Sequence, residues 1–144
     1  MQTIDQVQEE IIEEFAMFDD WMDKYALIIE QGNLLGKLDD EYKTPNNIID
    51  GCQSRVWLQT DYKDSKLYFR AESDAVIVKG LLAMVLKVFS GRTPDEIIAA
   101  DLRFLKEIGL TEHLSPTRSN GLLAVIKQIR FYAIAYKAKE EQSK

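Results

Sequence analysis

The sequence contains little of what most metal and disulfide sites need. Its 144 residues include one cysteine, Cys52, and one histidine, His113. A structural zinc site takes about four protein ligands, usually Cys and His, and an iron–sulfur cluster takes several thiolates. A single cysteine cannot form an internal disulfide, which is typical of proteins from a reducing compartment. We therefore expect a cytoplasmic protein that holds no metal or cofactor of its own.

Signals for phosphate binding, membrane insertion and secretion are also missing. The glycines Gly32 and Gly36 are isolated, and no Lys-Ser or Lys-Thr pair follows them as in a phosphate-binding loop. The longest apolar run, residues 75–89, contains two lysines and is too short to span a bilayer. Residues 1–5 lack the basic start and apolar run of a secretory signal. We expect neither a nucleotide nor a membrane as partner.

Positive charge is scarce in the first third of the chain. Residues 1–50 carry 13 acidic residues and three lysines, whereas residues 51–144 carry 15 basic and 11 acidic residues, within a net charge of −6. An acidic region repels nucleic-acid phosphates, so polynucleotide binding is not expected. These acids are expected to solvate the outer faces of two helices. The alternative is that they form part of a docking surface for a protein partner.

The apolar pattern predicts a single α+β domain over residues 1–144. Hydrophobic residues make up 46% of the chain and charged residues 29%, as in an ordinary globular domain. We expect a small antiparallel sheet of two to three strands packed against five to six helices. The C-terminal tail lacks an apolar pattern and is expected to fray from about residue 137.

Helices are predicted by apolar spacing and by capping residues. Thr3 with Gln6 and Thr93 with Glu96 form capping boxes, and Asp19 or Asp20 can begin a second helix. Ser73 or Asp74 is expected to cap a central helix that ends at Ser90 and Gly91. The predicted helices cover residues 4–18, 20–32, 74–89, 94–98, 101–108 and the chain after Ser115 or Ser119. In the last helix, we expect one buried face made of Leu122, Leu123, Ile126, Ile129 and Ala133.

Two strands are predicted between the second and third helices. Apolar and polar residues alternate over residues 56–61, and residues 67–71 continue the strand-like composition after a turn at residues 62–65. The two strands are expected to form an antiparallel hairpin. Residues 34–47 contain Gly36 and Pro45 and are predicted to be a loop. Trp57 is expected to be a core side chain, with a pocket wall as the alternative.

Cys52 lies on a short polar stretch just before the first strand. Gly51 precedes it and gives backbone freedom, and Gln53 and Ser54 follow with polar groups that can bond to a sulfur anion. A thiol reacts as its thiolate, which requires access and, near neutral pH, help from a positive charge. Arg55 and Arg118 are the candidates for that charge.

Other interpretations of these residues stay open. A lone cysteine is often a small buried apolar side chain without chemistry. Arg118 can instead clasp backbone carbonyls near the last helix. A Cys–His hydrolase would pair Cys52 with His113, but it also needs a third group that orients the histidine. The composition favours a protein whose single thiol, that of Cys52, accepts an atom from one molecule and gives it to another.

Three stretches, in order along the chain, resemble the SufE family of sulfur-acceptor proteins. The first is Gly51, Cys52, Gln53 and Ser54 followed by Val56 and Trp57; the second is Ser73, Asp74 and Ala75 followed by residues 77–81; the third is residues 113–122. The likeness extends from about Ile4 to Tyr136. The resemblance implies a SufE/IscU-like fold and identifies Cys52 as the acceptor cysteine, with Gly51, Gln53 and Ser54 as its loop companions.

The resemblance also implies a partner and a reaction. Cys52 would take persulfide sulfur from a SufS-type cysteine desulfurase, stimulate that enzyme, and pass the sulfur to a SufB-containing scaffold complex for iron–sulfur cluster assembly. The pyridoxal phosphate would belong to the desulfurase. Asp74 matches a family segment near the loop and is assigned to the docking surface. The chain would be a persulfide carrier, as monomer or homodimer, rather than a stand-alone enzyme.

Three alternatives to this function remain. The chain could be the acceptor of the paralogous Csd-type system. It could be a redox sensor that forms a sulfenic acid or mixed disulfide at Cys52. It could also be an interaction module in which Cys52 is inert and buried.

Overall fold

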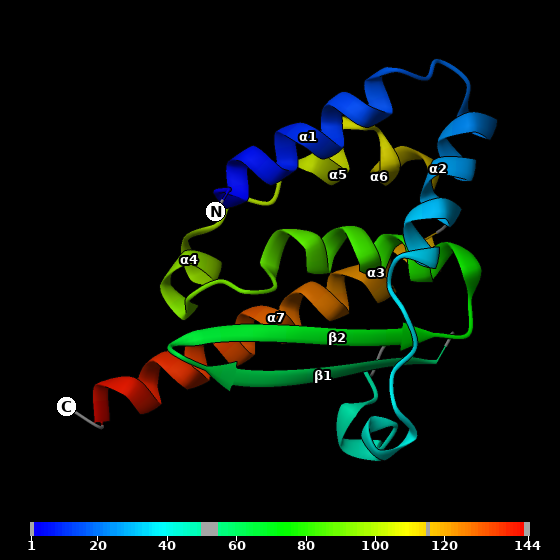
Figure 1. Cartoon of the computed structure of the whole chain (residues 1–144). Helices are drawn as coiled ribbons and strands as arrows, with labels where there is room; N and C mark the ends of the chain where they lie inside the picture. Colours follow the sequence, from blue (N-terminus) through cyan, green and yellow to red (C-terminus); the bar gives the residue numbers. More distant parts are fainter. Residues whose placement is uncertain (1, 50–54, 115, 143–144) are drawn as a thin grey trace.

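The computed structural model describes residues 2–49, 55–114 and 116–142. Within them, a two-stranded antiparallel sheet packs against α-helices (Figure 1), which confirms the predicted α+β class. In chain order the elements are α1 (Ile4–Ala16), α2 (Trp21–Asn33), the 3₁₀ turns η1 (Asp40–Tyr42) and η2 (Pro45–Asn47), β1 (Val56–Lys63), β2 (Lys66–Ser73), α3 (Val76–Phe89), α4 (Pro94–Ala99), α5 (Phe104–Glu107), α6 (Leu110–His113) and α7 (Pro116–Gln142).

Side-chain caps begin three of the helices as the sequence predicted. In α1 the backbone N–H of Gln6 donates to Thr3 Oγ1 at 3.1 Å, while the N–H of Thr3 donates to Gln6 Oε1 at 2.8 Å. Thr93 and Glu96 form the same reciprocal pair at α4. Asp20 accepts from the N–H of Met22 and caps α2. Each cap satisfies N–H groups that have no partner within the helix.

The hairpin is longer and tighter than predicted. Lys63 pairs with Lys66, so only Asp64 and Ser65 form the loop, and both have positive φ angles of 52° and 64°. Two positive φ values are typical of a type I′ turn, whose twist matches that of the strands. The residues predicted as the start of a four-residue turn, Tyr62 and Lys63, therefore belong to β1.

The start of α3 differs from the prediction. The helix begins at Val76, and its N-cap, Ala75, makes no side-chain cap. Ser73 is the last residue of β2, and its Oγ accepts from the N–H of Ala75 at 3.2 Å. The side chain of Asp74 accepts a hydrogen bond from the backbone N–H of Arg55 instead. Neither expected residue caps the helix: Ser73 bonds within the link between β2 and α3, and Asp74 bonds to the residue before β1.

The helix predicted over residues 101–108 is shorter than expected, and a second short helix follows it. α5 covers only Phe104–Glu107, and Gly109, with φ of 83°, turns the chain into the additional short helix α6. A positive φ is readily adopted by glycine, which explains why Gly109 separates two helical turns.

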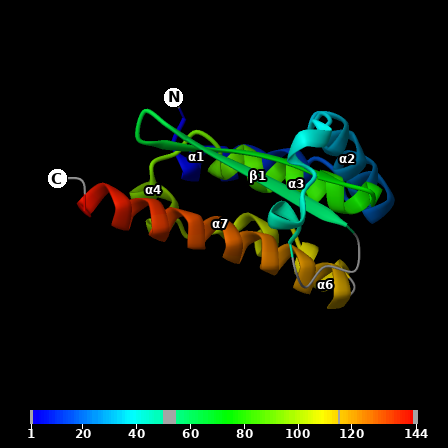
Figure 2. The ribbon, with the colours of Figure 1, turned by 90° about the horizontal axis from the view of Figure 1, so that it is seen from below.

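The last helix extends beyond the point where fraying was expected. α7 continues to Gln142 and crosses the molecule from α6 to the C-terminus (Figure 2). Lys137 pairs with Asp95 of α4 at 2.7 Å, the ring of Tyr136 stacks on Tyr62 of β1, and Glu140 accepts from the hydroxyl of Tyr62. These contacts hold the final turns, whose sequence alone gives no apolar pattern.

The core lies between the hairpin and the helices α3 and α7. Leu58, Leu67 and Phe69 point from one face of the sheet into the core, where α3 contributes most of its side chains. Helix α2 crosses α3 very closely at Gly80, because a Cβ atom there would lie 2.0 Å from the backbone oxygen of Ile28. Only glycine permits this approach of two backbones.

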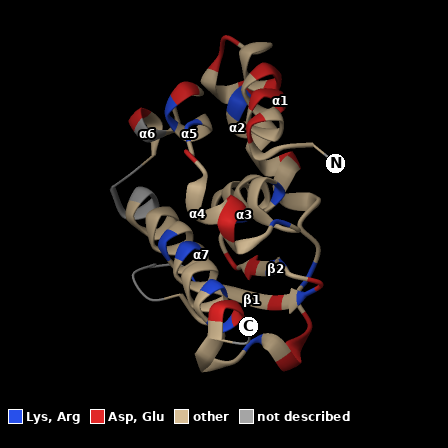
Figure 3. Ribbon diagram, turned by 90° about the vertical axis from the view of Figure 1, so that its left-hand side faces the viewer, with Lys and Arg blue, Asp and Glu red and all other residues tan. Residues whose placement is uncertain are grey.

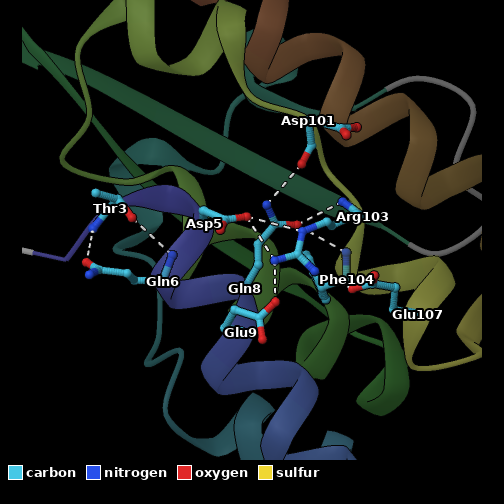
Figure 4. Close-up of polar contacts among 9 residues, drawn as sticks. All are labelled: Thr3, Asp5, Gln6, Gln8, Glu9, Asp101, Arg103, Phe104 and Glu107. Atoms are coloured by element: carbon cyan, nitrogen blue, oxygen red, sulfur yellow. Dashed lines mark hydrogen bonds and ion pairs between the residues drawn. The ribbon is translucent and has the colours of Figure 1, made fainter.

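A buried glutamine connects α1 with the segment before α5. Gln8 is 1% exposed, and its Nε2 donates to the backbone oxygen of Asp101 at 3.0 Å (Figure 4). Its Oε1 accepts from the N–H groups of Arg103 at 2.8 Å and Phe104 at 3.1 Å. The side chain of Arg103 pairs with three carboxylates on the surface, those of Asp5, Glu9 and Glu107. Buried polar groups are stable when their bonds are satisfied in this way.

Residues 38–47, predicted to be a loop, cover the outer face of the sheet. Leu38 donates its N–H to Glu72 Oε1 at 2.9 Å, and Lys43 Nζ pairs with Glu72 Oε2 at 2.7 Å. Asn47 Nδ2 donates to Gln59 Oε1 of β1 at 2.7 Å. These bonds fix the chain just before residues 48 and 49, where it approaches the cysteine stretch.

Candidate functional site

The two ends of the cysteine stretch are held together by backbone bonds. Ile49 and Val56 are both buried, and the N–H of Ile49 donates to the oxygen of Val56 at 2.9 Å. Ile48 and Trp57 form an isolated antiparallel bridge beside this bond. The intervening residues therefore leave from and return to one closed stem at the start of β1.

Asp74 lies at this stem. Its Oδ1 accepts from the backbone N–H of Arg55 at 3.2 Å, and the two residues are 19 positions apart in the chain. Val56 pairs with Ser73 in the sheet, so the ends of both strands meet at the same place. Asp74, assigned to the docking surface through the family resemblance, is exposed and adjoins the end of the cysteine stretch.

Most of the predicted site residues lie outside the described residues. Gly51, Cys52, Gln53 and Ser54 belong to the segment 50–54, whose structure is not described. Arg118 lies in the first turn of α7, and the description does not include its side chain. Its role beside the sulfur stays a prediction.

A groove of about 1190 Å³ begins at the stem and runs along α7. One wall is formed by η2 together with Ile48 and Ile49, and the other by α7 from Asn120 to Tyr132. Asn120 lies two positions after Arg118, and Ile49 lies directly before the cysteine stretch. The groove thus brings the start of α7 and the stem to one surface.

The groove exposes apolar side chains that the sequence did not assign to a site. Leu123 and Phe131 are each 60% exposed, and Ile48 is 41% exposed. Leu123 was predicted to lie on the buried face of the last helix, and this was wrong. Leu122 and Ile126 are buried, but Leu123 points away from them. In the sequence, residues 123, 127, 131 and 134 recur at three- and four-residue spacing and therefore share one side of the helix. Because Lys127 is among them, this spacing could have indicated that Leu123 faces solvent.

Positive charge accompanies these apolar residues. Lys127 and Arg130 line the groove, and none of its described lining residues is acidic. Figure 3 shows basic positions along α7 and several acidic positions on α1. Arg130 Nη2 also donates to the backbone oxygen of Ala100 at 3.1 Å, whereas Lys127 is exposed.

A charged pair holds the segment next to the stem. The hydrogen bond from Lys43, followed by the bond from the N–H of Leu38 and the charges of Lys43 and Lys79, lowers the pKa of Glu72 despite its partial burial. The Lys43 Nζ also lies 5.8 Å from the centre of the Trp57 ring. Trp57 is half-buried on the outer face of the sheet, so it packs under this segment rather than in the main core.

His113 has a structural position in this fold. Its ring stacks on Trp21 of α2 with centroids 3.7 Å apart, and its backbone oxygen accepts from the hydroxyl of Tyr25. These contacts join α6 to α2. Among the described residues, no group of three or more His, Cys, Asp or Glu side chains could hold a metal ion, and no helix is long and apolar enough to cross a membrane.

Comparison with known proteins identifies the family. The family model described as "SufE: Fe-S metabolism associated domain" matches residues 9–133. The chain belongs to the SufE family. The match covers the stem, Asp74 and the groove, and it associates the protein with iron–sulfur metabolism.

Two curated relatives agree with this assignment. An uncharacterized SufE-like protein of Rhizobium etli is 44% identical over 127 residues, which cover 85% of this chain and 86% of the relative. Another from Rhizobium meliloti is 44% identical and covers 85% of this chain and 91% of the relative. A solution structure of a hypothetical protein from Thermus thermophilus has a TM-score of 0.71 over 90% of this SufE-family chain and 94% of the other, at 16% identity, and so shares its fold.

Proposed function

We propose that Cys52 accepts sulfur from a SufS-type cysteine desulfurase and relays it to a SufB-containing scaffold complex. The observation that carries the proposal is the family match over residues 9–133, in a chain whose only cysteine lies in the stretch that resembles the family's acceptor. The closed stem and the adjoining Asp74 support it, because they hold the two ends of that stretch together beside the exposed residues Arg55 and Asp74.

The transfer is a thiol–disulfide type exchange without net oxidation. The Cys52 thiolate attacks the outer sulfur of the persulfide on the desulfurase cysteine. A new sulfur–sulfur bond forms at Cys52 as the bond within the donor persulfide breaks, and its electron pair leaves with the donor's cysteine sulfur as a thiolate. Cys52 then carries the persulfide, and an acceptor thiolate on the scaffold removes the outer sulfur by the same step.

The reaction requires no cofactor on this chain. The desulfurase supplies pyridoxal phosphate chemistry on L-cysteine, while this chain supplies one thiol and the surface that presents it. By accepting sulfur it also frees the desulfurase cysteine for another turnover, which is how we expect it to stimulate that enzyme. The transfer requires a reduced thiol at Cys52, and we therefore place the protein in the cytoplasm, where thiols stay reduced.

Intact-mass measurement tests the proposal. After incubation with a SufS-type desulfurase and L-cysteine, the chain is expected to gain ~32 Da, one sulfur atom, and to lose it on reduction. Cys52→Ser is the matched control and should gain nothing. Equal sulfur loading of Cys52→Ser would refute the proposal. A parallel incubation with a Csd-type desulfurase shows which of the two systems donates faster.

A further inference from the structure

The groove between η2 and α7 has the dimensions of a helix-binding site. It follows α7 from Asn120 to Tyr132. At 1.5 Å per residue this length is about 18 Å, which is about three turns of a second helix laid alongside. Grooves of this kind bind the apolar face of an amphipathic helix through side chains spaced three and four residues apart.

Three exposed side chains of the groove are large and apolar. Phe131 and Leu123 stand two turns apart on α7, each 60% exposed, and Ile48 faces them from the opposite wall at 41% exposure. Large exposed apolar side chains that line one groove, with polar residues among them, are typical of interaction surfaces. An apolar helix face would cover these three side chains together.

The charge of α7 indicates which charge the docked partner helix should carry. From Pro116 to Lys139, α7 contains no Asp or Glu, although the whole chain has a net charge of −6. Lys127 is exposed beside Leu123 and Phe131, and Arg130 lines the groove as well. Such a surface attracts an acidic partner and repels a basic one.

The location connects the groove with sulfur acceptance. Ile49 lines the groove and donates the backbone bond that closes the stem of the cysteine stretch. A protein that occupies the groove would therefore lie directly beside the stem. The acidic residues of α1 are held in part by Arg103, on another side of the fold.

We propose that an acidic, amphipathic helix of the sulfur-donating desulfurase docks in this groove. The helix would place its apolar face on Ile48, Leu123 and Phe131 and its carboxylates near Lys127. This inference rests on the proposed function, because it names the surface through which the donor reaches Cys52. It adds a binding step that can be measured without any sulfur transfer.

The affinity of the full chain for a SufS-type desulfurase tests the apolar contact. Phe131→Ser is expected to weaken binding about 30-fold, as for a central interface residue. Met22→Ser is the control, because Met22 is an exposed apolar side chain, 76% exposed, on α2 and is not among the described residues of the groove. The proposal is overturned if Phe131→Ser binds as tightly as wild type, or if Met22→Ser loses as much affinity.

Charge reversal tests the sign of the partner. Lys127→Glu is expected to weaken binding at low ionic strength, and the difference from wild type should shrink at about 1 M salt, where the Debye length is about 3 Å. Lys106→Glu, an exposed position on α5, is the control and should behave as wild type. Stronger binding by Lys127→Glu, or an equal effect of Lys106→Glu, would contradict an acidic helix.

Two readouts separate this inference from the proposed function. In sulfur-transfer kinetics, Phe131→Ser should raise the concentration of acceptor needed for half-maximal transfer, while the maximal rate stays near wild type because Cys52 is unchanged. If wild type gains no sulfur at all, the proposed function fails, and the binding measurements still decide about the groove. If sedimentation shows that Phe131→Ser dissociates a homodimer, the occupant is a second copy and the inference is wrong.

Discussion

Asp74 accepts a hydrogen bond from the backbone N–H of Arg55 across a distance of 3.2 Å. The bond joins the end of β2 to the residue that follows the cysteine stretch. It therefore fixes where that stretch re-enters the sheet, and it gives Asp74 a positioning role that is separate from any contact of its carboxylate with a partner.

Replacing Asp74 distinguishes these two roles. Asp74→Ala removes the acceptor and is expected to lower the rate of sulfur transfer to Cys52 about fivefold, equivalent to about 1 kcal/mol for one hydrogen bond. Asp74→Asn keeps an acceptor oxygen and should transfer sulfur at nearly the wild-type rate. The measurement is single-turnover transfer from a persulfidated desulfurase at saturating acceptor. If Asp74→Asn is as slow as Asp74→Ala, the charge matters and the hydrogen bond does not.

Gly80 is expected to be the glycine of the α2–α3 crossing that tolerates substitution least. A methyl group there would meet the Ile28 backbone oxygen at 2.0 Å, so Gly80→Ala must separate the two helices. We expect a loss of about 3 kcal/mol or more in the free energy of unfolding, measured by urea denaturation. Gly36→Ala is the control, because Gly36 has a positive φ but no atom within 4 Å of the added methyl. It should cost only about 1 kcal/mol.

The helix starts show which parts of the fold can be predicted from sequence. Thr3 with Gln6 and Thr93 with Glu96 were predicted as caps and are observed as caps, since both partners lie within one turn. The start of α3 could not be predicted in this way. Ser73 and Asp74 are good cap residues, but the neighbouring strand offered them other partners.

The candidate site was only partly visible in the sequence for a related reason. Cys52 and Asp74 could be selected by their resemblance to family motifs, which are local. The groove depends on η2 lying opposite α7, and these segments are about 75 residues apart in the chain. Leu123 was misplaced because α7 has apolar residues on several faces, so its spacing does not define one buried side.

Gln8 is expected to contribute to stability through its three buried bonds. Gln8→Leu keeps the volume approximately but leaves the N–H groups of Arg103 and Phe104 and the oxygen of Asp101 without partners. Unsatisfied buried groups cost about 1–3 kcal/mol each, and water entering the site reduces the total. We expect a loss of about 3 kcal/mol in the free energy of unfolding.

A second substitution identifies which bonds of Gln8 matter. Gln8→Glu keeps an oxygen for Arg103 and Phe104 but places a carboxylate oxygen against the backbone oxygen of Asp101. It should be destabilising as well, and part of the loss should be recovered when acid protonates the new carboxyl group and allows it to donate. A Gln8→Leu variant as stable as wild type would show that this network does not support the fold.

The Glu72–Lys43 pair is expected to make the outer face of the sheet sensitive to acid. The pKa of Glu72 is lowered in the folded chain, chiefly by the hydrogen bond from Lys43. A group with a lowered folded pKa contributes stability above its unfolded pKa, about 4.5 for glutamate, and loses it as the pH falls through the folded value. Lys43, whose pKa is raised, stays charged throughout this range.

Fluorescence of Trp57 in a Trp21→Phe background reports on this pair, because Lys43 lies over the Trp57 ring. As the pH is lowered below about 4.5, wild type should lose unfolding free energy and change its Trp57 emission, whereas Glu72→Gln should show a flatter profile from a lower starting stability. Asp40→Asn is the control, since Asp40 lies 3.5 Å from Lys43 but its side chain is 97% exposed. An unchanged acid profile in Glu72→Gln would mean that another carboxylate controls it.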